Sequence, residues 1–362
     1  MIPSSEYRSN IKKCIQEIYD MFGTRGGRVL ISGATGLIGS TMIDCLMDMN
    51  DEYHTDFKVI AVARNKKKAM GRFGVYIGRK DFQFIACDVN VPLPEVGGAD
   101  YVIHAASNTH PVEYISDPIG TIRTNIIGTE NMLEYARMHH SKRFVFLSSV
   151  EIYGENKGEV ESFGEKDFGY LDCNQLRSGY PESKRAGESL CCAYAACYGM
   201  DIVIPRLCRV YGPTMWQDDS KALAQFINRA VHNEDVALKS QGQQYYSYIH
   251  VLDAAKAIFY ILDKGEAGQA YNISSEVSNV KLYDLAHKLA EIAGTKVVFE
   301  MPDETEERGY SKATRAILDN KKLKALGWKE MYDIEKGLAE TVQVLREVAY
   351  KQEKCSDTAG KE

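Results

Sequence analysis

The sequence lacks the features that mark membrane, secreted and nucleic-acid-binding proteins. In its 362 residues, no apolar run approaches the roughly 20 residues that a membrane-spanning helix needs. Residues 1–8 contain no basic segment followed by an apolar core, so we expect no secretory signal. The formal net charge is −6, which gives no basic surplus to attract nucleic acid. We therefore expect a cytoplasmic protein with neither a membrane nor a nucleic-acid partner.

Cysteines at metal-binding or redox spacing are also missing. The nine cysteines are odd in number, and no two of them form a Cys-x-x-Cys motif. Several, such as Cys45 and Cys208, lie inside apolar segments with helix or strand patterns. We expect reduced thiols that serve mostly as small core residues, with no metal site and no disulfide framework.

The chain does contain a regular alternation of strand and helix patterns. Such alternation predicts an α/β protein built on a parallel, doubly wound sheet. Right-handed crossovers then place the carboxyl ends of all strands at one edge, where ligands bind. The predicted strands lie near residues 28–32, 58–63, 82–86, 101–106, 143–149 and 201–206.

The first predicted strand runs into a glycine-rich turn, Gly33-Ala-Thr-Gly-Leu-Ile-Gly39, which opens a helix. Glycine at positions 33, 36 and 39 permits a tight turn and a close backbone approach. The helix can therefore direct its N-terminus at a pyrophosphate. A turn of this kind between a strand and a helix predicts a dinucleotide site.

The end of the second strand bears on which dinucleotide binds. A carboxylate there normally binds the ribose hydroxyls of NAD. This chain instead has Arg64, then Asn65 and lysines at positions 66–68. A guanidinium suits the 2′-phosphate of NADP and slightly favours that cofactor. The alternative is a solvated, basic helix start with Arg64 stacked on adenine.

Tyr180 and Lys184 lie four residues apart in a predicted helix, so their side chains share one face. An ammonium close to a phenol stabilises the phenolate and lowers the tyrosine pKa from about 10. The phenol could then exchange a proton with a sugar hydroxyl while a hydride moves. An isolated pair of this kind is usually an ordinary surface contact. The glycine turn and the Ser148-Ser149 strand end favour the catalytic interpretation.

With these residues in place, the chain resembles the extended short-chain dehydrogenase/reductases that act on nucleotide sugars as epimerases, dehydratases and decarboxylases. The resemblance covers residues 28 to about 345 and implies a Rossmann-type sheet with a smaller C-terminal α/β substrate-binding domain. The motifs that carry it are Gly33–Gly39, Asp88-Val89, His104-Ala-Ala-Ser107, Asn125 to Thr129, Leu147-Ser-Ser-Val-Glu-Ile-Tyr-Gly154, Pro205-Arg206 through Tyr211-Gly-Pro213, and Tyr248 to Asp253.

The resemblance also implies a mechanism, in which NAD(P), usually NAD, oxidises a sugar carbon at C4 and later returns the hydride. Tyr180 would be the base for the C4 hydroxyl, Lys184 would lower its pKa, and Ser149 would orient the same hydroxyl. The implied cofactor contacts are Gly33, Thr35, Gly36, Leu37, Ile38, Gly39, Arg64, Asp88, Val89, Ala105, Ala106, Ser107, Asn125, Tyr180 and Lys184, and the substrate contacts are Thr109, Arg206, Arg209 and Tyr246.

Domain and subunit organisation follow from the same resemblance. We expect a helical extension at 1–27, a dinucleotide-binding domain at 28–206 with a returning segment near 246–265, and a polar tail at 346–362. The substrate-binding domain would combine 207–245 with 266–345. The family also implies a homodimer in which helices near 121–140 and 181–198 of two subunits form a bundle.

Glu151 bears on the reaction that follows C4 oxidation. Simple 4-epimerases usually have a small apolar residue at this position, whereas 4,6-dehydratases and UDP-glucuronate decarboxylases have Glu. In dTDP-glucose dehydratases an Asp precedes that Glu and protonates the leaving C6 hydroxyl, which Val150 cannot do. We therefore expect a redox-neutral lyase of decarboxylase or 4,6-dehydratase type on a nucleotide-diphosphate sugar, with Glu151 as second acid or base. A 4-epimerase and an NADPH-dependent keto-sugar reductase are the alternatives.

Two positions depart from the family pattern. Arg209 stands where the family commonly has Asn, and Tyr246 stands where it commonly has the Arg that contacts the diphosphate. One hypothesis is that the positive charge has moved from 246 to Arg209 and still neutralises the diphosphate. The other is that Arg209 pairs with a local acid and the substrate differs. From the sequence, no arginine can be assigned to a substrate carboxylate.

Overall fold

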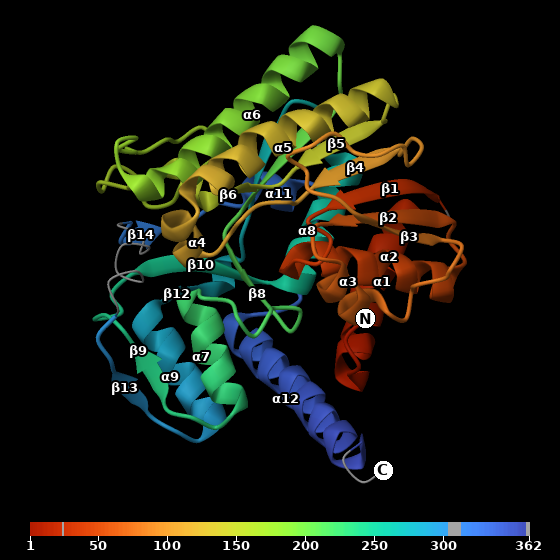
Figure 1. The fold of residues 1–362 in the computed structure, drawn as a ribbon. Coiled ribbons are helices and arrows are strands. Elements are labelled where there is room, and N and C mark those ends of the chain that lie inside the picture. The colour runs from red at the N-terminus through yellow and green to blue at the C-terminus, as the bar shows by residue number, and fades with distance from the viewer. Residues whose placement is uncertain (24, 303–312, 360–362) are drawn as a thin grey trace.

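The computed structural model describes residues 1–23, 25–302 and 313–359. The largest sheet in these ranges has eight strands, and helices cover both of its faces (Figure 1). No helix in the same ranges is both long and apolar enough to cross a membrane. The predicted α/β class with a doubly wound parallel sheet is confirmed.

The large sheet has the order β11-β7-β5-β4-β1-β2-β3, with β6 beside β7, and all its pairings are parallel. The order reverses between β1 and β4, which is where such sheets open a ligand crevice at their carboxyl ends. The strands are β1 (Gly27–Ser32), β2 (Phe57–Ala63), β3 (Phe82–Ala86), β4 (Tyr101–His104), β5 (Arg143–Phe146), β6 (Ser148–Ser149), β7 (Ile202–Leu207) and β11 (Ala270–Ile273).

Each face of the sheet has its own hydrophobic core because successive strand residues point to opposite sides. In β1, Val29 and Ile31 join the core beneath α1, α2 and α8, whereas Leu30 joins the core beneath α5 and α6. The near-continuous apolar runs seen in the sequence follow from this double burial. The helices are α1 (Ser5–Phe22), α2 (Leu37–Tyr53), α3 (Lys66–Phe73), α5 (Pro118–Met138), α6 (Gly179–Tyr198) and α8 (Val251–Lys264).

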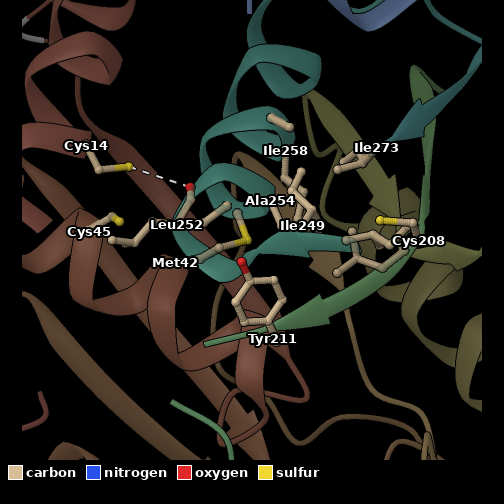
Figure 2. Packing of buried hydrophobic residues seen from close by; sticks show 14 of the residues in the cluster. Cys14, Met42, Cys45, Cys208, Tyr211, Ile249, Leu252, Ala254, Ile258 and Ile273 are labelled. Carbon is tan, nitrogen blue, oxygen red and sulfur yellow. Dashed lines mark hydrogen bonds between the residues drawn. The ribbon is translucent and has the colours of Figure 1, made fainter. Parts of the chain in front are cut away.

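The N-terminal helix α1 is an integral layer of the fold. Its apolar face is buried against α2 and α8, and Ser4 caps it by accepting a hydrogen bond from the Tyr7 N–H. Figure 2 shows Cys14 of α1 directed at α8, where its thiol donates to the Leu252 carbonyl at 3.7 Å. Cys45 of α2 lies nearby in the same layer. The expected extension at 1–27 therefore completes one face of the sheet.

The cysteines divide between core and surface. All eight whose side chains are described are free. The expectation of core thiols holds for half of them, because Cys14, Cys45, Cys191 and Cys208 are buried while Cys173, Cys192 and Cys197 are exposed.

A smaller part lies against the carboxyl ends of the large sheet. It contains the sheet β12-β10-β14, with β8 beside β10, and the pair β13-β9. After β10, helix α8 leads the chain back to the large sheet, where β11 pairs with β7. The returning segment therefore extends past 265 to Ile273. The elements of the smaller part are β8 (Arg209–Tyr211), α7 (Ala222–Val231), β9 (Val236–Leu238), β10 (Tyr245–His250), β12 (Asn279–Lys281), α9 (Leu282–Ala293), β13 (Val297–Phe299) and β14 (Arg315–Ala316). Two short helices remain with the large sheet: α4 (Pro111–Ser116) packs against α5, and α11 (Lys321–Ala325) packs against β11.

The last helix, α12, spans Ile334–Ala359 and packs against α7, α9 and β10. The expected polar tail at 346–362 therefore begins inside a helix, and residues 360–362 lie outside the described residues.

Candidate active site

A cavity of about 990 Å³ lies at the carboxyl ends of the strands and is lined by both parts of the molecule. It brings together Ser149, Glu151, Tyr180 and Lys184. The predicted cofactor contacts in its lining are Gly33, Thr35, Gly36, Leu37, Ile38, Gly39, Arg64, Asp88, Val89, Ala105, Ala106 and Ser107, and the predicted substrate contacts are Thr109, Arg209 and Tyr246.

The glycine turn forms an open cradle at the start of α2. Gly33 has φ +68°, and a Cβ there would lie 2.6 Å from the Ala105 carbonyl carbon. A Cβ on Gly39 would lie equally close to the Gly33 oxygen. Gly36 caps α2 without a side-chain hydrogen bond, so the N–H groups of the first turn remain available to an anion. This cradle fits the pyrophosphate of a dinucleotide.

A loop from the smaller part, residues 212–221, crosses the glycine turn, and we call it the strap. The Trp216 Nε1 donates to the Thr35 carbonyl at 2.9 Å. Its ring lies under two cations, with Lys68 Nζ 4.8 Å and Arg72 Cζ 4.4 Å from the ring centroid. Arg72 also donates to the Thr214 carbonyl at 2.7 Å. The strap therefore fastens the substrate part of the chain to the cofactor turn and to α3.

The end of β2 presents a basic edge to the cavity. Arg64 is exposed and lines the cavity together with Lys66 and Lys68. Its Nη2 donates to Asn108 Oδ1 at 3.2 Å. Asn108 in turn donates to Thr121 at the start of α5, which orders the guanidinium at the cavity wall.

The catalytic candidates lie where α6 faces the end of β6. Tyr180 and Lys184 are 5% and 3% exposed. Ser149 ends β6 and accepts a hydrogen bond from the Glu151 N–H at 3.2 Å. Lys184 Nζ donates to the Leu147 carbonyl at 2.8 Å. Serine, phenol and ammonium therefore share one wall of the cavity, as the motif spacing predicts.

The expected lowering of the Tyr180 pKa by Lys184 is not found. Burial raises the pKa of Tyr180 to about 12, opposed mainly by its hydrogen bond with Ser149. The Lys184 ammonium is instead directed at the Leu147 carbonyl and lies 4.9 Å from the centroid of the Phe146 ring. Burial lowers the pKa of Lys184 to about 8. In this structure, desolvation therefore outweighs the charge effect expected from the spacing.

A second phenol adjoins the first. The Tyr114 ring of α4 stacks on Tyr180 with centroids 4.5 Å apart and planes 19° apart. Burial, followed by the charge of the neighbouring Tyr180 phenol, raises the pKa of Tyr114 well above its usual value. No local pattern points to Tyr114, because it lies 66 positions before Tyr180 in the sequence.

Glu151 lies among guanidinium groups. Arg177 Nη1 donates to its Oε2 at 3.0 Å, and Arg209 Nη2 lies 3.9 Å from its Oε1. Burial raises the pKa of Glu151, but the two positive charges and the Arg177 hydrogen bond together hold that pKa below its ordinary value. Glu151 is therefore an ionised carboxylate in this structure.

Arg177 was missed by the sequence analysis. It belongs to a short 3₁₀ turn, Leu176–Ser178, that leads directly into α6. Its position three residues before Tyr180 could have suggested it, because side chains three residues apart in a helical turn share a face. Arg177 supplies a cation at the same cavity wall as Glu151.

Two predicted residues lie outside the cavity lining. Arg206 forms a double hydrogen bond with Glu188, at 3.0 and 2.7 Å, and a further one with the Tyr153 hydroxyl. It thus ties β7 to α6 instead of facing a substrate. Asn125 joins Ser107 to Ser183 by hydrogen bonds and positions the loop after β4.

Together, the sheet topology, the glycine cradle and the Ser149, Tyr180 and Lys184 wall define a dinucleotide-dependent α/β enzyme. The model of the NAD dependent epimerase/dehydratase family matches residues 29–274. The chain belongs to this family. This confirms the resemblance inferred from the motifs.

Proteins similar to this chain include decarboxylases, dehydratases and epimerases. The chain is 29% identical over 318 residues to UDP-glucuronic acid decarboxylase 3 of Arabidopsis thaliana, covering 86% of each protein. Its structure is similar to a dTDP-glucose 4,6-dehydratase from Streptomyces venezuelae solved with NAD (TM-score 0.75, 24% identity, 88% of this chain and 97% of that one). It is also similar to a UDP-glucuronic acid 4-epimerase from Bacillus cereus (TM-score 0.73, 20% identity, 89% and 99%).

Proposed function

We propose that the protein is a redox-neutral lyase that removes the carboxyl group of a nucleotide-diphosphate sugar after transient oxidation at C4. The observation that carries the proposal is the placement of an ionised Glu151 and two guanidinium groups, those of Arg177 and Arg209, in one cavity with the catalytic wall. Guanidinium groups suit an anionic sugar. Several named relatives are UDP-glucuronic acid decarboxylases, which supports the same substrate class.

The chain's own residues hold the sugar for oxidation. Bound in its oxidised form, NAD would accept a hydride from C4, and its positive ring would favour the ionised form of Tyr180. Tyr180 would take the C4 hydroxyl proton while Ser149 holds the same oxygen. Lys184, fixed by the Leu147 carbonyl, would bind the nicotinamide ribose. These assignments are the ones that the family resemblance implies, and the grouping of the three side chains at one cavity wall supports them.

The C4 ketone prepares the second step. A carboxylate at C5 is then β to a ketone, so its loss as carbon dioxide leaves an enolate oxygen between Ser149 and Tyr180. The substrate carboxylate would lie close to Glu151 at this wall. A like charge so close would raise the pKa of Glu151, so that it could take up a proton from solvent as the substrate binds and give that proton to C5 once carbon dioxide has left.

A 4,6-dehydratase is the second candidate because Glu151, as the structure holds it, is ionised and could accept a proton from C5. The buried side chain of Val150 counts against a dehydratase, since it cannot act as the acid for a leaving C6 hydroxyl.

The proposed function can be tested by incubating the protein with UDP-, dTDP-, GDP- and CDP-linked glucose and glucuronate and measuring the mass of the products. Loss of carbon dioxide is expected. Loss of water, or an unchanged mass with altered stereochemistry, would contradict the decarboxylase.

The basic edge formed by Arg64, Lys66 and Lys68 supports use of NADP as well as the family's NAD. Arg64 stands where a carboxylate would select against the 2′-phosphate, and Asn108 holds it at the cavity wall. We therefore propose that this chain can bind NADP as well as NAD.

A homodimer through α5 and α6 is also proposed. The outer faces of these helices expose Ile119, Ile122, Met138 and Tyr198, which is the pattern of an apolar contact surface. On the opposite side of α5, Leu133 and Ala136 pack against the sheet, whereas Ala193 of α6 is exposed. The free thiols support a reducing compartment such as the cytoplasm.

A further inference from the structure

Arg209 is a poorly satisfied cation of the cavity wall. Its side chain is 22% exposed, and its buried Nη1 has no hydrogen-bond partner within the described residues. Its ion-pair distance to Glu151, 3.9 Å, is at the outer limit for such a contact. A buried donor without a partner costs stability, and native structures contain few of them. A bound anion would satisfy it.

Arg177 shows the contrasting case in the same cavity. It approaches Glu151 to 3.0 Å and donates a hydrogen bond to it. Glu151 therefore makes its close contact with Arg177, and a single carboxylate lies between two guanidinium groups. The charge of Arg209 is in surplus at this wall, which is the arrangement expected of a subsite for a second anion.

Tyr246 fixes the plane of this guanidinium. The Arg209 Cζ lies 3.4 Å from the centroid of the Tyr246 ring. Strands β8 and β10 pair in parallel with Tyr248 opposite Arg209, so the stacked ring comes from the adjoining strand. The Tyr246 hydroxyl donates to the Ala313 carbonyl at 2.6 Å, which anchors the ring. The two positions that depart from the family pattern are therefore in direct contact and form one unit.

We infer that Arg209, stacked on Tyr246, binds the C5 carboxylate of the sugar and selects a hexuronic acid over a neutral hexose. This inference rests on the proposed function. It differs from the hypothesis that the charge serves the diphosphate, because Arg209 lies beside Glu151, and Glu151 follows Ser149 of the catalytic wall by two residues. The diphosphate is the other possible source of an oxyanion, and the experiment separates the two.

The test measures binding by calorimetry in a Tyr180→Phe background, where turnover is blocked. The probes are UDP-glucuronate, UDP-glucose and UDP, which differ in the carboxylate and in the sugar. In Arg209→Asn, which restores the common family residue, we expect affinity for UDP-glucuronate to fall about 10-fold or more, and that for UDP-glucose and UDP to change by less than about 3-fold. Lys67→Asn removes an exposed cation that lies outside the cavity lining and should leave all three affinities unchanged.

Two outcomes would overturn the inference. An equal loss for all three probes would place Arg209 on the diphosphate. Unchanged binding of UDP-glucuronate would remove Arg209 from the subsite altogether.

Thermal unfolding supplies a readout that needs no nucleotide sugar. Because Arg209 is poorly satisfied, Arg209→Gln should leave the melting temperature unchanged or raise it by about 2 °C. Arg177→Gln should lower it, since Glu151 loses its close partner. If no UDP ligand bound, the proposed substrate would be wrong, yet a fall in melting temperature for Arg209→Gln would still contradict the surplus charge argued above.

Discussion

The two ends of the cavity are built differently. At the cofactor end, three side chains join elements of the fold to one another: Trp216 donates to Thr35, Arg72 to Thr214 and Arg64 to Asn108. At the sugar end, two guanidinium groups face one carboxylate, and Arg209 retains a buried donor without a partner among the described residues. Contacts within the fold therefore shape the cradle for a cofactor, whereas surplus positive charge at the other end suits an anionic substrate.

The largest effect is expected at the catalytic phenol. Tyr180→Phe removes the proton acceptor for the C4 hydroxyl and should lower turnover by about 10³-fold. Tyr114→Phe is the matched control, because it removes the stacked neighbouring hydroxyl but leaves the acceptor, and its loss should be at least 10-fold smaller, on the order of general acid–base contributions. Steady-state rates on the same nucleotide sugar provide the comparison. Equal losses would mean that the two phenols do not differ in role.

Glu151→Gln should separate the two chemical steps. The sugar would still be oxidised at C4, but C5 would lack its acid, so turnover falls about 10²-fold. Reduced cofactor should then accumulate, which its near-ultraviolet absorbance reports in a single turnover. Glu113→Gln, another carboxylate of the cavity lining, is the control and should accumulate none. An unaltered rate in Glu151→Gln would exclude it from the second step.

The strap tests the cofactor end. Trp216→Ala removes the hydrogen bond to Thr35 and the contacts with Lys68 and Arg72, so dinucleotide release should accelerate about 10-fold. Trp216→Phe keeps a ring between the cations and should show a smaller increase. Release can be followed by dilution of the loaded enzyme into a trapping excess of labelled cofactor. Parent-like release in the alanine variant would show that the strap does not retain the dinucleotide.

Arg64→Ala addresses cofactor choice. Loss of a guanidinium from the 2′-phosphate should weaken NADP binding about 10-fold and leave NAD within about 2-fold. Lys67→Ala removes a neighbouring exposed charge outside the cavity lining and serves as control. If both dinucleotides weakened equally, Arg64 would instead contact a part that they share.

The smallest effect concerns pH. Because burial lowers the pKa of Lys184 to about 8, its ammonium is present below that pH and lost above it. Dinucleotide affinity should therefore decline a few-fold as pH rises through 8. Lys184→Arg, which stays charged, should flatten this decline. The same slope in both proteins would assign the titration to another group.

Local motifs predicted that the glycine turn and the Tyr180–Lys184 pair would lie at one cavity. The glycine turn and the Tyr180–Lys184 pair consist of neighbours in sequence, and backbone geometry alone places their atoms together. The guanidinium cluster was different, because Glu151 and Arg177 are 26 residues apart and Arg209 comes from a further strand. Arg206 illustrates the same limit: its pairing with Glu188 depends on how β7 meets α6.

The Tyr180 pKa shows a second limit of sequence reasoning. Spacing indicated that Lys184 would stabilise the phenolate, but the shift depends on burial and on where the ammonium points. Neither follows from a four-residue interval. Similarly, the strap joins Trp216 to Thr35 across 181 residues, and no local pattern signals such a contact.

The most direct test of a redox-neutral decarboxylation uses UDP-glucuronate with deuterium at C4. The account predicts a product that has lost carbon dioxide, retains the deuterium at C4 and leaves the cofactor in its original oxidation state. A product without deuterium, with reduced cofactor formed in equal amount, would contradict it.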